Sequence, residues 1–194
     1  MGSVVANMSM SLDGFVAGPN DEVDHVFAWY NAGPVRVETE NPDFTVNLTP
    51  ESAEVFRPGA PGALITGRRL FDLTNAWGGK HPMGAHVFVV THRVPDGWPR
   101  EDAPFTFVTD GVASAVRQAK DLAGDRDVAL ATPTITQQCL ELDLVDVIAV
   151  DLVPVLLGEG IPFFAGLGKA PITLGTPTII EAEGVTHLRY AVRR

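Results

Sequence analysis

Short apolar runs, each closed by turn residues, recur along almost the whole chain. Runs of this length, rich in valine and other apolar residues, are typical of buried strands. We expect strands over residues 4–10, 63–66, 86–91, 105–108, 127–131 and 145–153. Helical spacing lies between some of them: Val112, Ala115, Val116 and Ala119 repeat as one helix face over 111–123, before Gly124. Strands that alternate with helices predict a largely parallel sheet covered on both faces.

Start signals place the other helices. Thr49 and Pro50 form an N-cap and first-turn pair for a helix to about residue 56, and Asp110 is the N-cap candidate of the 111–123 helix. Thr132 and Pro133 open a helix over 133–142, and another helix over 68–73 follows the strand at 63–66.

Two segments are read differently. Residues 24–31 predict a short helix that turns Val26, Phe27 and either Trp29 or Tyr30 inward, whereas residues 35–48 show no clear pattern. At the C-terminus, residues 172–183 and 185–193 read as two strands joined at Glu183-Gly184. We therefore expect an antiparallel edge on the parallel sheet. No repeat or long linker interrupts the 194 residues, which indicates one domain over 1–194.

Composition narrows the function classes. The formal net charge of −10 opposes nucleic-acid phosphates, so we expect no nucleic-acid partner. No apolar stretch approaches the roughly 18 residues of a membrane span, and the N-terminus lacks the pattern of a secretory signal. The sequence predicts a cytoplasmic protein without a membrane partner.

Covalent and metal chemistry have little support in the sequence. Cys139 is the single cysteine and lies within a predicted helix without an evident base. His81, His86 and His187 are scattered, and we expect them to be structural or exposed. The prediction is therefore no metal site.

In this architecture ligands bind where strand ends meet helix starts. The first such junction is Thr66-Gly67-Arg68-Arg69, where a glycine allows close backbone approach and two arginines suit phosphate. The second is Thr91-His92-Arg93, whose side chains suit an adenosine 2′-phosphate. The alternative for both is an ordinary turn with solvated charges.

The third junction is the apolar loop at 155–164, which contains Gly158-Glu159-Gly160. It lacks the third glycine of a dinucleotide fingerprint. Such a loop either forms the wall of a site for a flat substrate or is a hydrophobic turn that packs on the core.

Taken together, three motifs resemble the family that unites dihydrofolate reductase with the reductase domain of bacterial riboflavin biosynthesis. They are residues 8–18 (MSMSLDGFVAG), 66–69 (TGRR), and 144–146 (LVD) with 153–160 (VPVLLGEG). The resemblance covers nearly the whole chain. It implies a three-layer dihydrofolate-reductase-like α/β fold with a mixed, mainly parallel sheet, and a homodimer. It also implies NADPH as cofactor and hydride transfer to a small-molecule substrate, a planar heterocycle or an imine or carbonyl compound.

The resemblance also implies site residues. Asp13 is the best matched catalytic carboxylate, and Asp24 is the second candidate. Cofactor-binding positions are Asn7, Gly14, Phe15, Gly67, Arg68, Arg69, Thr91, His92, Arg93, Thr132, Pro133 and Thr134. Substrate-binding positions are Ser11, Trp29, Leu157, Gly158, Glu159 and Phe163.

One departure from the family pattern concerns the phosphate site. Where the family has a Gly-Gly turn, this chain has Ala131-Thr132-Pro133-Thr134, and proline brings no N–H to donate. The substitution favours an alternative function, a reductase-fold protein that binds a small ligand or partner without catalysis. A third alternative is a flavin in place of NADPH. The retained Gly67-Arg68-Arg69 and Asp13-Gly14 favour the reductase.

Overall fold

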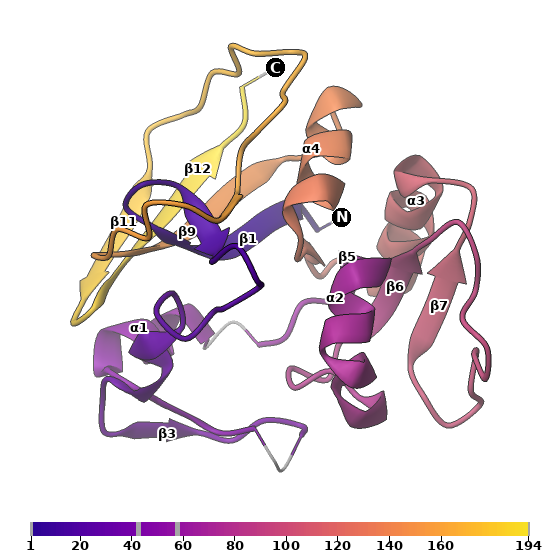
Figure 1. Ribbon diagram of the computed structural model, residues 1–194, viewed down its shortest axis with the longest axis horizontal. Helices are drawn as coiled ribbons and strands as arrows, with labels where there is room; N and C mark the ends of the chain where they lie inside the picture. The colour runs from indigo at the N-terminus through magenta and orange to yellow at the C-terminus, as the bar shows by residue number, and fades with distance from the viewer. Residues whose placement is uncertain (1, 42–43, 57–58, 194) are drawn as a thin grey trace.

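A computed structural model describes residues 2–41, 44–56 and 59–193 (Figure 1). Its centre is an eight-stranded sheet of order β11-β12-β9-β1-β8-β5-β6-β7. The strands are β1 (Val4–Ser11), β5 (Ala63–Gly67), β6 (His86–Val90), β7 (Phe105–Val108), β8 (Val128–Leu130), β9 (Val147–Val153), β11 (Thr178–Ala182) and β12 (Val185–Ala191). From β9 to β7 all neighbours are parallel, whereas β12 and β11 are antiparallel. The expected mixed sheet with an antiparallel C-terminal edge is confirmed.

Helices cover both faces of this sheet (Figure 1). They are α1 (Pro50–Phe56), α2 (Arg68–Leu73), α3 (Val112–Ala123) and α4 (Pro133–Glu141), with two 3₁₀ turns, η1 (Ala28–Asn31) and η2 (Asn75–Gly79). Two small antiparallel pairs complete the described elements: β2 (Phe15–Ala17) with β10 (Ile161–Pro162), and β3 (Val35–Val37) with β4 (Val46–Leu48).

Alternation along the strands divides the core into clusters on opposite faces. On one face, Ala6 and Ile65 pack with Ala115 of α3 and Ile135 of α4 in the largest cluster. The opposite face carries two smaller clusters. One surrounds Phe71 of α2, and the other joins the residues Trp29, Val46, Leu48, Val153 and Val185. The central strands between these two clusters are left to line a cleft.

Several local expectations change. Thr49 does cap α1, because its Oγ1 accepts a hydrogen bond of 3.2 Å from the N–H of Ser52. Asp110 is not the N-cap of α3, since Gly111 takes that place with a φ of +96°. The expected strand over 172–183 is reduced to β11, preceded by a single bridge from Leu174 to Val192. Of the expected helix over 24–31, only the second half is regular, as η1.

Candidate active site

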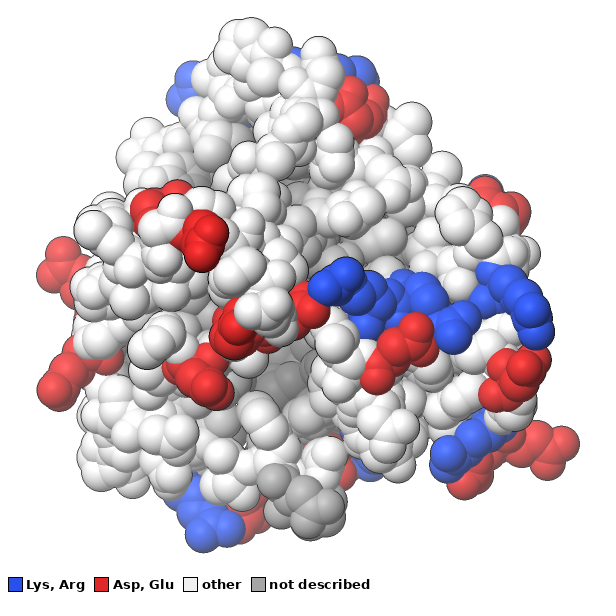
Figure 2. Space-filling view, viewed as in Figure 1, with Lys and Arg blue, Asp and Glu red and all other residues white. Residues whose placement is uncertain are grey.

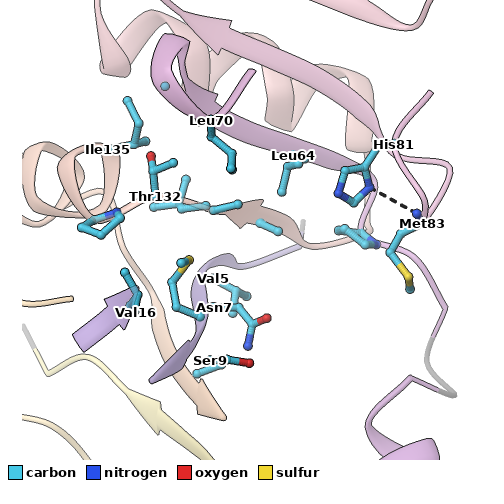
Figure 3. Close-up of a pocket in the computed structure, with 18 of the residues that line it drawn as sticks. Val5, Asn7, Ser9, Val16, Leu64, Leu70, His81, Met83, Thr132 and Ile135 are labelled. Carbon is cyan, nitrogen blue, oxygen red and sulfur yellow. Dashed lines mark hydrogen bonds between the residues drawn. The ribbon is translucent and has the colours of Figure 1, made fainter. Parts of the chain in front are cut away.

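One large cleft crosses the face of the sheet between the two smaller clusters, with a volume of about 1880 Å³. It is visible as the hollow in Figure 2. Pockets for single small ligands are usually about 300–1000 Å³, so this one has room for a dinucleotide and a second molecule. Figure 3 shows Val5, Asn7 and Ser9 of β1 pointing into it, opposite Leu64, Leu70 and Thr132.

One end of the cleft is cationic. Arg68, Arg69 and Arg93 line it together with Thr91 and His92, because β5 and β6 are parallel neighbours that end at the same edge. Figure 2 shows a band of Lys and Arg beside the hollow. Strand ends thus bring together two motifs that are separated by more than twenty residues in the sequence.

Each of these arginines is held by a carboxylate. Arg68 Nε donates to both oxygens of Asp72 at 2.8 and 2.9 Å. Arg69 makes a two-pronged pair with Asp21 at 3.1 and 2.5 Å, and hydrogen bonding to Asp21 raises the pKa of Arg69. The side chain of Arg69 is still 72% exposed, and that of Arg93, paired with Asp96, is 80% exposed. All three guanidinium groups are therefore placed by the protein and remain within reach of a ligand.

The start of α4 adds polar groups to this end. Thr132 occupies the N-cap position and Pro133 follows it, as the sequence predicts, but the Thr132 hydroxyl makes no capping bond. Its Oγ1 is buried and has no partner among the described residues. It lies next to β5, since a Cβ built on Gly67 would be 3.7 Å from it. The first turn of a helix also leaves backbone N–H groups unpaired. A hydroxyl and amides are thus available to an anion here.

The other end of the cleft contains a buried carboxylate and imidazole. Asp151 of β9 and His187 of β12 both line the cleft. They are directly opposite each other in the antiparallel register, and Oδ1 of Asp151 is 2.7 Å from Nδ1 of His187. The other ring nitrogen, Nε2, is 2.9 Å from the hydroxyl of Ser52 in α1. Asp151 is 8% exposed, His187 5% and Ser52 1%. Within the described part of the chain, no hydrogen bond reaches Oδ2 of Asp151.

Aromatic rings surround this acid end. Phe27, Tyr30, Phe44 and Phe56 line the cleft, and Tyr30 packs edge-on against Phe44 and Phe56 with ring centres 6.0 and 6.3 Å apart. Burial, and to a smaller extent the charge of Asp151, raises the pKa of the Tyr30 phenol. Tyr30 is therefore a neutral hydrogen-bond donor throughout the physiological range.

Asp13 has a different environment from the one that the resemblance implied. It accepts hydrogen bonds from Ser11 Oγ at 2.6 Å and from the backbone N–H groups of Leu157 and Gly158 at 3.2 and 2.7 Å. The Ser11 hydroxyl is the main cause of the lowered pKa of Asp13. Neither Asp13 nor the exposed Asp24 lines the cleft. In this geometry the Asp13 carboxylate links the loop after β1 to the loop after β9 through hydrogen bonds.

Some of the other predicted positions line the cleft and some do not. Cofactor positions that line the cleft are Asn7, Gly67, Arg68, Arg69, Thr91, His92, Arg93, Thr132, Pro133 and Thr134; Gly14 and Phe15 do not line it. None of the predicted substrate positions Ser11, Trp29, Leu157, Gly158, Glu159 and Phe163 lines it. Trp29 is buried and donates from Nε1 to Ser9 Oγ at 3.0 Å, whereas its neighbour Tyr30 faces the cleft. Phe163 is a core residue, 1% exposed.

Sequence reasoning missed Asp151, His187 and Tyr30 as cleft residues. A signal for Asp151 is present, because it is the one charged residue in the apolar run Val147–Val153. A lone carboxylate within a buried strand requires a partner or a ligand. His187 and Tyr30 carry no comparable signal, because their neighbours come from distant parts of the chain.

The described residues contain neither a helix that could span a membrane nor a cluster of side chains that could hold a metal ion. No helix there is long and apolar enough to cross a membrane. No three or more His, Cys, Asp or Glu side chains in that part of the chain lie together as a metal site would require.

Comparison with known proteins shows the fold. No protein-family model matches the sequence, and no curated protein does. Among solved structures, a putative riboflavin biosynthesis protein from Shewanella sp. PV-4 matches over 99% of both chains, with a TM-score of 0.73 and 20% identity. Dihydrofolate reductase from Enterococcus faecalis, solved in complex with NADP(H), matches over 100% of this chain and 98% of its own, with a TM-score of 0.60 and 12% identity.

A third match is a two-activity protein from Thermotoga maritima, a diaminohydroxyphosphoribosylaminopyrimidine deaminase and 5-amino-6-(5-phosphoribosylamino)uracil reductase. It has a TM-score of 0.65 and 12% identity, and the match covers 99% of this chain and 57% of that one. The strand order, the helices on both faces and these full-length matches agree with each other, and the chain has the dihydrofolate-reductase-like fold.

Proposed function

We propose that the protein is an NADPH-dependent reductase of a small planar heterocycle or an imine or carbonyl compound. The observation that carries the proposal is the polarity of the cleft. One end presents arginines and an unpaired hydroxyl, and the other presents aromatic rings and a buried carboxylate. A dinucleotide has phosphates at one part and a flat ring at another, so it matches both the volume and the polarity of this cleft.

The residues present fit the phosphates of such a cofactor. Arg68, Arg69 and Arg93 supply the positive charge, and the Thr132 hydroxyl with the first turn of α4 supplies neutral donors. Of the carboxylates that now hold the arginines, Asp72 and Asp96 are 52% and 93% exposed and Asp21 is 20% exposed. Ion pairs near the surface contribute little to stability. A phosphate can therefore replace them. When bound, the reduced nicotinamide supplies the hydride.

The acid end of the cleft suits a flat substrate. Phe27, Tyr30, Phe44 and Phe56 offer apolar walls, while Asp151 and the Tyr30 phenol offer an acceptor and a donor that orient a heterocycle. Asn7 lies between the two ends on β1 and is the polar side chain best placed to contact a nicotinamide amide. A structural neighbour solved with NADP(H) supports this use of the fold.

Titration of NADPH tests the proposal. We expect saturable binding at micromolar concentration, followed by nicotinamide fluorescence or by calorimetry. Arg69→Ala should weaken it by about tenfold or more, since a charge-assisted bond to phosphate is lost. Arg117→Ala is the matched control, because Arg117 lies on α3 at the opposite face and should leave binding unchanged. Absence of binding up to millimolar NADPH would overturn the proposal.

Turnover is tested with a defined panel. NADPH oxidation is followed with dihydrofolate, with 5-amino-6-(5-phosphoribosylamino)uracil, and with simple cyclic imines and ketones. Oxidation with any of these compounds supports a reductase. If NADPH binds and none of them is reduced, a second function is favoured, that of a protein which binds a nucleotide or other small ligand without catalysis. Pro133, which gives no N–H to a phosphate, favours this second function.

A further inference from the structure

The acid end of the cleft contains a continuous polar unit inside an apolar surrounding. Ser9, Asp151 and His187 stand at one register position on the neighbouring strands β1, β9 and β12. Trp29 donates to Ser9, and Ser52 of α1 contacts the far side of the His187 ring. Side chains at one register position share a face of the sheet. The unit is therefore positioned by the sheet itself rather than by mobile loops.

Burial of a carboxylate and an imidazole has a cost that packing alone does not explain. An apolar pair of the same size is often as stable or more stable than a buried ion pair. The fold nevertheless places Asp151 and His187, both less than a tenth exposed, at 2.7 Å from each other. The ring is also held from its second side by Ser52, and the indole of Trp29 packs edge-on against it with centres 5.1 Å apart. Such double fixation is typical of a residue that orients a catalytic group.

The open position in this unit is Oδ2 of Asp151. One carboxylate oxygen is occupied by His187, while the other has no partner within the described chain and belongs to a residue that lines the cleft. Ser52, by contrast, does not line the cleft and is 1% exposed. Ser52, His187 and Asp151 could act as a nucleophilic triad only if a ligand reached the Ser52 hydroxyl. The burial of Ser52 prevents that contact. The reactive end of the unit is therefore the carboxylate.

We propose that Asp151 is the catalytic residue that gives a proton to the substrate, and that His187 and Ser52 are its positioning residues. This inference rests on the proposed reductase function. The substrate carbon gains a hydride from the reduced nicotinamide, which is oxidised to the nicotinamide cation. The electrons of the C=N or C=O bond move to nitrogen or oxygen. When Asp151 is protonated at Oδ2, that atom takes the proton from it, so the O–H bond of Asp151 breaks as the new N–H or O–H bond forms. The carboxylate that remains accepts a hydrogen bond from Nδ1 of His187 and regains its proton from water in the cleft.

A competing acid at this end of the cleft is the Tyr30 phenol, which also lines it. Burial raises the pKa of Tyr30, so the phenol gives up its proton less readily. Tyr30 is suited to donate a hydrogen bond and to orient the ring. Comparison of Asp151→Asn with Tyr30→Phe therefore separates the two assignments, because each substitution removes the acidic proton and keeps the shape.

Steady-state kinetics on the panel compound that is reduced supply the first test. We expect Asp151→Asn to lower kcat by about a hundredfold or more, as removal of a general acid does, with KM and NADPH affinity within about threefold of wild type. Tyr30→Phe should affect KM more than kcat. Ser52→Ala should lower kcat to a smaller extent, and Asp151→Glu should restore part of the loss. If Asp151→Asn keeps kcat within threefold, or if Tyr30→Phe is the variant that loses it, the assignment is overturned.

A second readout does not depend on turnover. The Nδ1 proton of His187, hydrogen-bonded to Asp151 at 2.7 Å and buried, should give a downfield, slowly exchanging proton NMR signal. The signal should vanish in His187→Gln and in Asp151→Asn, and shift in Ser52→Ala. A signal unchanged in Asp151→Asn would overturn the coupling of the pair. If no compound in the panel is reduced, this proposal falls together with the reductase; if turnover is present but insensitive to Asp151, this proposal falls alone.

Discussion

The unpaired hydroxyl of Thr132 predicts opposite effects on stability and on binding. Thr132→Val keeps the β-branched shape and replaces the hydroxyl by a methyl group. The Oγ1 atom is buried and has no hydrogen-bond partner among the described residues, and it makes no capping bond that the substitution would break. A hydroxyl left in this state costs about 1–3 kcal/mol. We therefore expect Thr132→Val to raise the free energy of unfolding by about that amount in the absence of ligand.

The expected change is measurable. For a chain of this length, each kcal/mol corresponds to about 2–4 °C in Tm, so the variant should melt roughly 2–12 °C above wild type. Calorimetry or circular dichroism would record it. In the same variant NADPH affinity should fall about tenfold to a hundredfold, because a donor to phosphate is lost.

Thr136→Val is the matched control. Thr136 belongs to the same helix and does not line the cleft, and its buried Oγ1 also has no partner in the part of the chain that the structure describes. It should gain stability to a similar extent and leave NADPH binding unchanged. A Thr132→Val protein that melts lower than wild type, or one that binds NADPH as tightly, would refute the reasoning for Thr132.

Three further predictions follow from other parts of the structure. Burial lowers the pKa of His81 to about 4, so between pH 6.5 and 4 the unfolded chain binds a proton that the folded chain does not. The free energy of unfolding should therefore fall by up to about 3 kcal/mol as the pH drops through this window. Urea unfolding at pH 7 and pH 5 should show the fall in wild type and little of it in His81→Asn. Gly160→Ala would put its Cβ 2.1 Å from the carbonyl oxygen of Ala17, so it should lower stability by roughly 3 kcal/mol or more. Gly124→Ala should cost less, about 1–3 kcal/mol, because its φ of +63° and ψ of −117° strain the backbone but its Cβ would meet no atom within 4 Å. A loss for Gly160→Ala no larger than that for Gly124→Ala in thermal unfolding would contradict the clash. Asp21→Asn removes the charge that holds Arg69 and should tighten NADPH binding by up to about fivefold; weaker binding on titration would mean that Asp21 orients the arginine for the ligand.

The regular elements were predictable where the signal is local. The continuous apolar run before Pro154 and the helical spacing of 111–123 each contain their own evidence, and both elements form as expected. The strand expected from residue 172 fails for a tertiary reason, since before Thr178 only the bridge from Leu174 reaches the C-terminal strand. Sequence patterns do not show how far a neighbouring strand extends.

The candidate site shows the same difference between features with a local sequence signal and features that depend on distant contacts. The cationic end was predictable, because Gly67-Arg68-Arg69 and Thr91-His92-Arg93 each follow a strand and parallel strands end together. The acid end was not, because the partner of Asp151 is 36 residues away and only the register of β9 and β12 brings them together. Asp13 was expected at the chemistry from its motif, but the structure uses it to join two loops. A motif identifies a position in the fold, and the contacts decide what the residue does there.

The strand order also bears on how the chain folds. The central strand β1 is near the N-terminus, yet its two neighbours, β8 and β9, come more than 110 residues later in the sequence. Both edges of this apolar strand therefore stay unpaired until residues 128–153 have been synthesised. Pairings of such large sequence separation slow folding, and exposed strand edges favour aggregation. We expect slow refolding and a need for chaperones or low concentration during it, whatever the stability of the finished protein.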